Sequence, residues 1–376
     1  METLKKILVY GMTSNPGGLE SYIMSMFRHM DRDAVQMDFL TDFEEIAYEE
    51  EIRAAGARIH KIPKKSKHPV AHLRAIGRIL RAHPEYETVY FNILNAGAAF
   101  SMWPVRRKGR RIVAHSHNSS DGNLRLHRAF QTRLRRWADE KLACSEVAAR
   151  FMFGDADVDA GRVTVIHNAI ELENYRFDAR IRQAKRAELG LGEQQLAVLH
   201  VGRISEQKNP HKVLDIMRAL HEKAPDAVLL YVGTGEMEEE IRTRVRTEGM
   251  EGYVRFLGVR RDVAALMQAA DAFLLPSLYD GLPIVLVEAQ AADLPIAAAD
   301  TISREARITD RLQYIALSAA PEAWAEAILQ GQNDLRREDT TAQMCAAGYD
   351  IREEAKRLTG FLIAQQQDKM GAAEKK

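Results

Sequence analysis

Two acidic residues in the second half of the chain, Asp280 and Glu288, are separated by seven residues. Asp280 precedes Gly281 in an expected turn, where neighbouring backbone amides could bind hydroxyl groups. Glu288 lies within the apolar run 283–289, which predicts the first turns of a buried helix. Burying a carboxylate is costly unless it is paired or hydrogen-bonded, so a ligand with a vicinal diol, such as a ribose, would account for it. A carboxylate satisfied within its own helix is the alternative.

Two cationic residues lie just after another expected strand. Arg203 and Lys208 fall between residues 197–201 and a helix expected to begin near Pro210. There, a guanidinium and an ammonium group could neutralise a diphosphate and stabilise it as it leaves. A solvated loop is the alternative. Gly233 and Val259 lie in two further strand-to-helix turns, which together favour a nucleotide pocket although each alone is ordinary.

The first half of the chain offers a glycine turn and a histidine. Gly17 and Gly18 follow the first expected strand and precede a helix, whose N-terminus favours an anion such as phosphate. The turn lacks the spacing of a dinucleotide-binding or P-loop motif, so a plain tight turn is equally compatible with it. His117 follows the strand 112–115 and could bind or orient a substrate hydroxyl, unless it is structural.

Metal chemistry finds little support in the sequence. His115 and His117 lack a nearby set of Cys, Asp or Glu that would complete a ligand cluster. The acids at positions 155, 157 and 159 spell the Asp-x-Asp pattern of metal-dependent transferases, but they lie in a polar loop before a strand. The two cysteines, Cys144 and Cys345, have no metal or redox spacing and fit a reducing compartment. We therefore expect no metal, and none of these residues implies a cofactor.

Short apolar runs alternate with amphipathic stretches, which predicts βαβ units and parallel sheets. The expected strands are residues 7–10, 36–40, 88–92, 112–115, 141–144 and 163–166, then 197–201, 227–232, 254–256, 272–275 and 295–298. The expected helices include 19–30, 210–223, 236–248 and 264–269. The series occurs twice, and 376 residues exceed what one core usually serves. We expect an α/β protein with Rossmann-like domains at 1–180 and 190–348, and a helix at about 349–367 that crosses back to the first.

The formal net charge is zero, but the charge is uneven. Residues 58–136 contain about 18 Lys and Arg against about 3 Asp and Glu. Solvated helix faces would explain any one cluster, whereas the regional excess predicts contact with an anionic surface. The basic residues lack interleaved aromatics and a known nucleic-acid module, so we expect no nucleic-acid partner. No apolar stretch is long and continuous enough to predict a spanning helix.

Taken in order, these segments resemble the family-4 retaining glycosyltransferases of the two-Rossmann-domain GT-B fold. The resemblance runs over almost the whole chain. The segments at its C-terminal end are similar to the branch that builds bacterial capsular polysaccharides and exopolysaccharides. The segments that carry it are Gly17-Gly18, the His117 segment, 143–146, 165–170, 202–209, 280–288, 300–305 and 349–351.

The resemblance implies a role for each matching residue. Arg203 and Lys208 would hold the diphosphate of a nucleotide sugar, assisted by the amide of Gly18, and Glu288 would bind the ribose. The remaining positions implied to contact the donor are His117, Gly17, Gly233, Val259, Asp280, Gly281, Leu282 and Pro283. His117 and Asp280 would face the transferred sugar, and with Arg203 and Lys208 they form the implied catalytic set.

One segment departs from the family pattern. The family has Glu at the first acid and usually Gly-Phe-Gly after it, whereas this chain has Asp280-Gly281-Leu282-Pro283. The Asp carboxylate would sit about 1 Å further back, and a shift of that size matters for a catalytic contact. Pro283 also removes one backbone N–H. The departure predicts altered sugar contacts and unaltered diphosphate and ribose contacts.

The function implied is transfer of a hexose or N-acetylhexosamine from a nucleoside-diphosphate sugar, expected to be a UDP-sugar. The acceptor would be a lipid-linked glycan at the inner face of the cell membrane, met by a cytoplasmic enzyme through its basic N-terminal domain. Two alternatives remain open at this point. One is a sugar-nucleotide epimerase of the same fold, and the other is a nucleotide-sugar-binding protein that has lost turnover.

Overall fold

The computed structural model describes residues 4–15, 17–119, 124–333 and 336–364. The chain divides into two compact units. Unit 1 comprises Met1–Ala169 and Asp350–Lys376, and unit 2 comprises Ile170–Tyr349. Among the helices of the described residues, none combines the length and apolar character needed to cross a bilayer.

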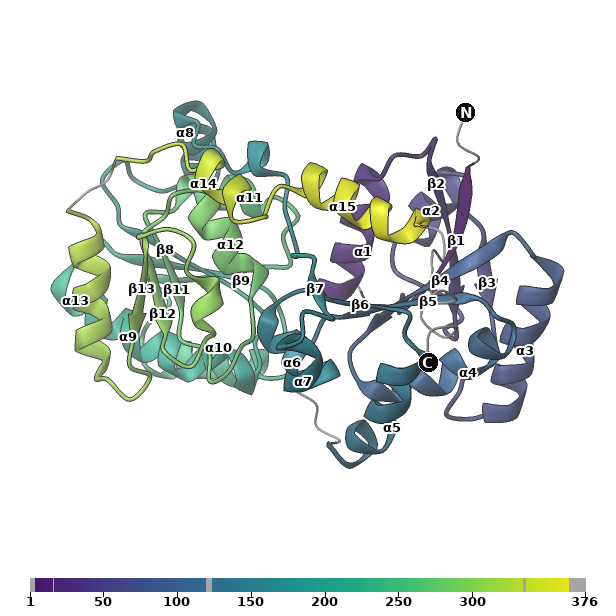
Figure 1. Ribbon diagram of the computed structural model, residues 1–376. Helices are drawn as coiled ribbons and strands as arrows, with labels where there is room; N and C mark the ends of the chain where they lie inside the picture. The colour runs from purple at the N-terminus through teal and green to yellow at the C-terminus, as the bar shows by residue number, and fades with distance from the viewer. Residues whose placement is uncertain (1–3, 16, 120–123, 334–335, 365–376) are drawn as a thin grey trace. The chain divides into compact units, whose positions relative to one another are not determined.

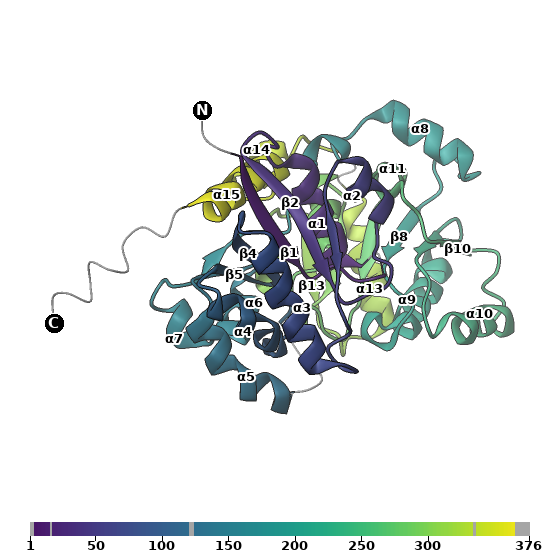
Figure 2. The ribbon, with the colours of Figure 1, turned by 90° about the vertical axis from the view of Figure 1, so that its right-hand side faces the viewer.

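Unit 1 is built on a seven-stranded parallel sheet with the order β3-β2-β1-β4-β5-β6-β7 (Figures 1 and 2). Its strands are β1 (Lys5–Tyr10), β2 (Val35–Thr41), β3 (Ile59–Lys61), β4 (Tyr86–Ile93), β5 (Arg111–Ser116), β6 (Glu140–Ala143) and β7 (Thr164–Val165). Its helices are α1 (Gly18–His29), α2 (Glu49–Ala54), α3 (Pro69–Ala82), α4 (Ala99–Arg107), α5 (Leu124–Trp137), α6 (Glu146–Phe153), α7 (Asp155–Val158) and α15 (Ile351–Ile363), with a 3₁₀ turn η1 (Ala96–Ala98).

Side-chain alternation along β1 shows how both faces of this sheet are buried. Ile7 and Val9 enter a core with α1 and α15, whereas Leu8 and Tyr10 enter a second core with α3, α4 and α5. The C-terminal helix α15 is tied to the sheet, because Arg111 Nη1 donates to the carbonyl of Phe361 at 2.6 Å. The final part of the expected C-terminal helix, residues 365–367, lies outside the described residues.

Unit 2 is built on a six-stranded parallel sheet with the order β10-β9-β8-β11-β12-β13. Its strands are β8 (Ala197–Val201), β9 (Val228–Val232), β10 (Val254–Gly258), β11 (Ala272–Leu275), β12 (Ile296–Ala299) and β13 (Leu312–Ile315). Its helices are α8 (Ala179–Glu188), α9 (Pro210–Lys223), α10 (Glu238–Thr247), α11 (Val263–Ala269), α12 (Ile284–Ala291), α13 (Pro321–Gly331) and α14 (Thr341–Ala346), with 3₁₀ turns η2 (Leu172–Asn174), η3 (Glu206–Lys208) and η4 (Arg304–Ala306). One core packs α11 and α12 on the sheet, and the other packs α9, α10 and α13.

The two doubly wound parallel sheets confirm the expected fold class. Two strands were not predicted, β3 and β13, each at an edge of its sheet. Both are short, at three and four residues, and both mix apolar with polar side chains. A short strand of mixed side chains shows neither a continuous apolar run nor a clear alternation, so its sequence carries a weak signal.

Candidate functional site

The strand order of unit 2 reverses between β8 and β11, which are neighbours in the sheet. Ligands of open α/β sheets bind at such a switch point, beyond the carboxyl ends of the strands. The loop 202–209 follows β8, and the loop 276–283 follows β11. These loops carry Arg203, Lys208 and the segment from Asp280 to Pro283, all singled out from the sequence.

Lys208 and Asp280 form an ion pair across the switch point. The Lys208 side chain is 16% exposed and that of Asp280 is 15% exposed, so both charges are largely withdrawn from water. Asp280 also forms an isolated parallel bridge with Ile302, which follows β12. The structure therefore brings together a cation and an acid that are 72 residues apart in sequence.

Arg203 differs from Lys208 in that its side chain is exposed. Within the described part of the chain its guanidinium has no hydrogen-bond or ion-pair partner. The backbone on either side is held, because Gly202 N donates to the Val232 carbonyl and Ile204 N to that of Thr234, both at 3.0 Å. A free guanidinium on a fixed backbone is suited to binding an anion from solution.

Two glycines allow the loop after β8 to pack against the turn after β9. A Cβ on Gly233 would lie 2.0 Å from the Gly202 carbonyl oxygen, and one on Gly235 would lie 2.2 Å from that of Ile204. Gly233 also has a φ of +127°, which side chains rarely adopt. Gly233 therefore lets the turn after β9 pack closely against the backbone that carries Arg203.

The loop after β11 is fastened to the loop after β8. Leu278 N donates to the Gln207 carbonyl at 2.9 Å, and Gln207 Nε2 donates to the Tyr279 carbonyl at 3.1 Å. Gly281, Leu282 and Pro283 then lead into α12, with Pro283 at its N-cap. They consequently lie at the positive end of a helix, next to Asp280.

Glu288 lies on the second turn of α12 and is partly exposed. Its Oε1 accepts a 2.7 Å hydrogen bond from the hydroxyl of Tyr175. Burial raises the pKa of the Glu288 carboxyl, and the bond from Tyr175 lowers that pKa in part. Sequence reasoning missed Tyr175, because it lies outside the expected strands and helices, between the strands expected at 163–166 and 197–201.

Val259 is 76% exposed and follows β10. It comes directly after Gly258, which has a positive φ of +64° that turns the chain out of the sheet. An apolar side chain held in solvent at this edge of the sheet can cover the face of a flat ring.

In unit 1, Gly17 caps α1 and Gly18 is its first residue. The turn is held from within, because Glu20 accepts from Gly17 N at 3.1 Å and from the Thr13 hydroxyl at 2.5 Å. A Cβ on Gly18 would meet nothing within 4 Å, so the start of α1 is open. The strand order of unit 1 also reverses here, between β1 and β4.

His117 belongs to a group of aromatic residues beside α1. Its Nε2 lies 2.9 Å from Oδ1 of Asn92, and its ring lies 4.6 Å from that of Tyr22 and 4.2 Å from that of His115. Burial lowers the pKa of His117 to about 3, so the imidazole is neutral at physiological pH. A hydrogen bond with the side chain of Asn168 raises the pKa of His117 in part, but burial is the larger effect. Asn92 was not singled out from the sequence, where it is simply the end of an apolar strand.

The Asp-x-Asp residues serve ion pairs. Asp157 accepts from Arg135, Lys141 and Arg162, each at 2.7–2.9 Å. Asp155 and Asp159 both pair with Arg150. Arginine and lysine side chains therefore occupy the positions from which a metal ion would have to bind these carboxylates.

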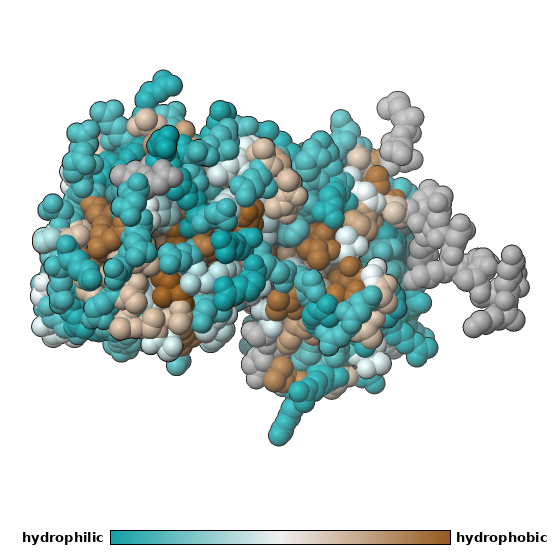
Figure 3. All heavy atoms as spheres, turned by 60° about the vertical axis from the view of Figure 1, so that its left-hand side comes forward, coloured by the Kyte–Doolittle hydropathy of each residue, from teal (hydrophilic) through white to brown (hydrophobic). Residues whose placement is uncertain are grey.

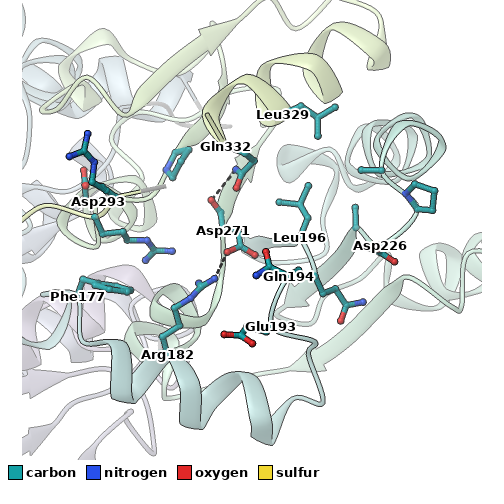
Figure 4. A pocket seen from close by; sticks show the side chains of 17 residues that line it. Phe177, Arg182, Glu193, Gln194, Leu196, Asp226, Asp271, Asp293, Leu329 and Gln332 are labelled. Atoms are coloured by element: carbon teal, nitrogen blue, oxygen red, sulfur yellow. Dashed lines mark hydrogen bonds and ion pairs between the residues drawn. The ribbon is translucent and has the colours of Figure 1, made fainter. Parts of the chain in front are cut away.

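A pocket of about 570 Å³ lies elsewhere in unit 2 (Figure 4). Residues at or just before the starts of β8, β9, β11 and β12 line it, which places it at the amino ends of the strands. Arg182 and Arg337 in its wall donate to carbonyls at the end of α11, and Arg182 also pairs with Asp271. Its guanidinium groups therefore fasten α8 and the 336–340 segment to the sheet.

Comparison with known proteins matches both units to glycosyltransferase families. A family model described as "Glycosyltransferase Family 4" matches residues 16–174, and one described as "Glycosyl transferases group 1" matches residues 181–344. A Bacillus subtilis (strain 168) protein that is named as a glycosyltransferase, EpsF, is 30% identical over 370 residues. That match covers 93% of this chain and 94% of the relative.

Two further proteins are similar to this chain. The Escherichia coli UDP-Gal:alpha-D-GlcNAc-diphosphoundecaprenol alpha-1,3-galactosyltransferase is 32% identical over 141 residues, 37% of this chain and 36% of the relative. The crystal structure of Anabaena Alr3699/HepE in complex with UDP-glucose is similar with a TM-score of 0.70. It is 20% identical and covers 98% of both chains, and it supports the fold.

Proposed function

Because this chain belongs to the family-4 glycosyltransferases, we propose that it transfers a hexose or N-acetylhexosamine from a UDP-sugar to a lipid-linked glycan, with retention at the anomeric carbon. The observation that carries the proposal is the arrangement around the switch point of unit 2. There Arg203 and the Lys208–Asp280 pair follow neighbouring strands, and Glu288 follows on α12. The pathway we propose is the synthesis of a bacterial surface polysaccharide, such as an exopolysaccharide or capsule.

The charges at this site suit a departing nucleoside diphosphate. As the bond from the sugar to the diphosphate breaks, negative charge grows on the phosphate oxygens. Arg203 is free to bind those oxygens bidentately, and Lys208 adds a second positive charge without a metal ion. Displacement on the same face of the sugar, assisted by the leaving phosphate, would retain the configuration. UDP as the nucleotide draws support from the UDP and UDP-glucose complexes of Alr3699/HepE.

We place the acceptor on unit 1. A pocket of about 270 Å³ lies at its switch point, between the ends of β1, β2 and β4. Lys64 and Lys65 line it together with Asp42, Asn92 and Asn95. Two lysines at the rim of a polar pocket suit an acceptor with a diphosphate. The Escherichia coli relative, named for its diphosphoundecaprenol acceptor, supports this class of acceptor.

We also propose that the basic part of unit 1 meets an anionic membrane, peripherally and at its inner face. Trp103 on α4 is 41% exposed, and Leu124 and Leu126 on the adjacent α5 are 48% and 44% exposed. Arg125 and Arg128 lie beside these leucines with no partner among the described residues. On the face shown in Figure 3, hydrophobic residues form several separate patches.

Analysis of products tests the reaction. The enzyme is incubated with UDP-sugars, with and without a lipid-diphosphate-linked sugar, and the products are analysed by mass spectrometry and NMR. A new α-glycosidic bond made from an α-linked donor supports the proposal. An epimerised UDP-sugar formed without acceptor would refute the transferase and favour the epimerase. A new linkage with inverted configuration would refute retention.

Vesicle flotation tests the membrane claim separately. Binding to phosphatidylglycerol vesicles should fall as salt rises, and Arg125→Ala/Arg128→Ala should weaken it. Arg180→Ala is the control, since this arginine of unit 2 has a side chain that is 94% exposed. Equal binding by neutral vesicles, or none at low salt, would refute the claim.

A further inference from the structure

We infer that Tyr175 is a positioning residue for nucleotide binding, which holds the Glu288 carboxylate in the orientation that accepts the ribose hydroxyls. This inference rests on the proposed function, because it assigns Glu288 to the nucleotide. Tyr175 donates to Oε1 of Glu288 at 2.7 Å, across 113 residues of sequence. Within the described part of the chain, Oε2 has no such partner and stays available to a ligand.

The position of Tyr175 is fixed by contacts on several sides. It follows the 3₁₀ turn η2, its amide donates to the Leu172 carbonyl at 3.0 Å, and its side chain is packed in the core of unit 2. The residue is only 9% exposed. A tyrosine held this way directs its hydroxyl along one line, so the bond selects one rotamer of Glu288.

Gln268 provides the second layer of this arrangement. Its side chain is fully buried on α11 and binds the segment around Tyr175 through both of its polar atoms. Gln268 Nε2 donates to the carbonyls of Tyr175 and Arg176 at 3.1 and 2.8 Å, and Oε1 accepts from Asp178 N at 3.0 Å. The carboxylate is thus set by a chain of contacts from α11 through Tyr175 to α12.

The same bond governs the charge of Glu288. Burial is the larger effect on the Glu288 pKa and raises it, while the Tyr175 hydroxyl lowers it. Among the described residues, Tyr175 is the titratable group that shifts the pKa of Glu288, and Glu171 shifts the pKa of Tyr175 instead. The pKa of Tyr175 is itself raised far above its usual range by burial, so the hydroxyl stays a donor. Removing it leaves a Glu288 that protonates at higher pH.

A pure packing role for Tyr175 would leave this pH dependence unchanged. Tyr175→Phe keeps the ring and removes only the donor, so the loss is confined to the bond with Glu288. Tyr314→Phe is the matched control, because it removes a 2.6 Å bond from another tyrosine of unit 2, to the backbone carbonyl of Ser303. Glu288→Gln reports whether the carboxylate takes part in binding at all.

The experiment is isothermal titration of the full-length wild type and these three variants with UDP, from pH 5 to pH 8. Tyr175→Phe should bind UDP about tenfold more weakly at pH 7, the range for a hydrogen bond to a charged group. As the pH is lowered, Tyr175→Phe should lose UDP binding at a higher pH than the wild type does. Normalising each variant to its own affinity at pH 8 separates this shift from any loss of stability.

The outcomes separate the inference from the proposal beneath it. Wild-type affinity in Glu288→Gln would refute the role of Glu288 and with it the ribose assignment. Weak binding by Glu288→Gln, together with a Tyr175→Phe profile that matches Tyr314→Phe, would refute only the positioning role. A tenfold loss with a shifted acid limb in Tyr175→Phe alone supports it.

Discussion

Asp280→Asn is expected to move nucleotide binding and sugar transfer in opposite directions. Asp280 forms an ion pair with Lys208, and both side chains are about 15% exposed. A diphosphate that binds Lys208 must compete with this carboxylate and is repelled by it. Asparagine keeps the shape of the side chain and removes the negative charge, so the competition disappears while the sugar loses a charged contact.

The magnitudes follow from the burial of the pair. Breaking a buried ion pair costs about 3–5 kcal/mol and an exposed one less than about 1 kcal/mol. The pair is slightly exposed, and the asparagine amide can still accept from Lys208. We therefore expect Asp280→Asn to lower the free energy of unfolding by about 1–2 kcal/mol, or the melting temperature by about 3–6 °C. Two unit charges about 6 Å apart at an effective dielectric constant of ~20 interact by about 3 kcal/mol. Solvent screening reduces this to about 1 kcal/mol, or about fivefold tighter UDP binding.

The assay compares calorimetric affinity for UDP with the rate of sugar transfer. Asp280→Asn should bind UDP more tightly yet transfer sugar at least about tenfold more slowly, since a hydrogen bond to a charged group is lost. Asp215→Asn is the control, because it neutralises another ion-paired carboxylate of unit 2, one bound by Arg244. Weaker UDP binding by Asp280→Asn would refute the competition between Asp280 and the diphosphate.

Three further outcomes follow. Arg203→Ala should leave the melting temperature within about 1 °C of wild type, because the exposed guanidinium has no partner among the described residues. The same change should weaken UDP binding at least tenfold by calorimetry. A large loss of stability would contradict an unpaired Arg203 guanidinium. Gly233→Ala should lower the melting temperature of unit 2 and weaken UDP binding, whereas Gly252→Ala, where a Cβ meets nothing within 4 Å, should change neither. The folded pKa of His117, about 3, lies below the usual 6.5, so its contribution to stability is present above pH 6.5 and lost as pH falls toward 3. His117→Gln should flatten that loss in thermal melts, and an unchanged pH profile would contradict a neutral His117.

The fold was predictable because its strongest signals are local. Buried parallel strands such as β1 and β8 are short apolar runs, and helices such as α9 begin at a proline and end after a regular apolar stripe. The glycine-containing turns after these strands also made it possible to find in the sequence the loops that lie at the switch point. Edge strands β3 and β13 escaped because their sequences are short and mixed.

The candidate site was predictable in type and less so in its contacts. The sequence placed Arg203 and Lys208 after one strand and Asp280 after another, yet only the sheet order makes those strands neighbours. The Lys208–Asp280 pair therefore could not be read from the chain. Tyr175 and Asn92 were not predicted either, because each contacts a candidate site residue through one hydrogen bond across a long stretch of sequence.

The most direct test of the central claim is the rate of nucleoside diphosphate release from UDP-, GDP- and ADP-sugars, with and without a lipid-diphosphate-linked acceptor. We expect release from a UDP-sugar, stimulated by the acceptor and lost in Arg203→Ala and Lys208→Ala. No release from any of these donors, or release that persists unchanged in both variants, would contradict the account.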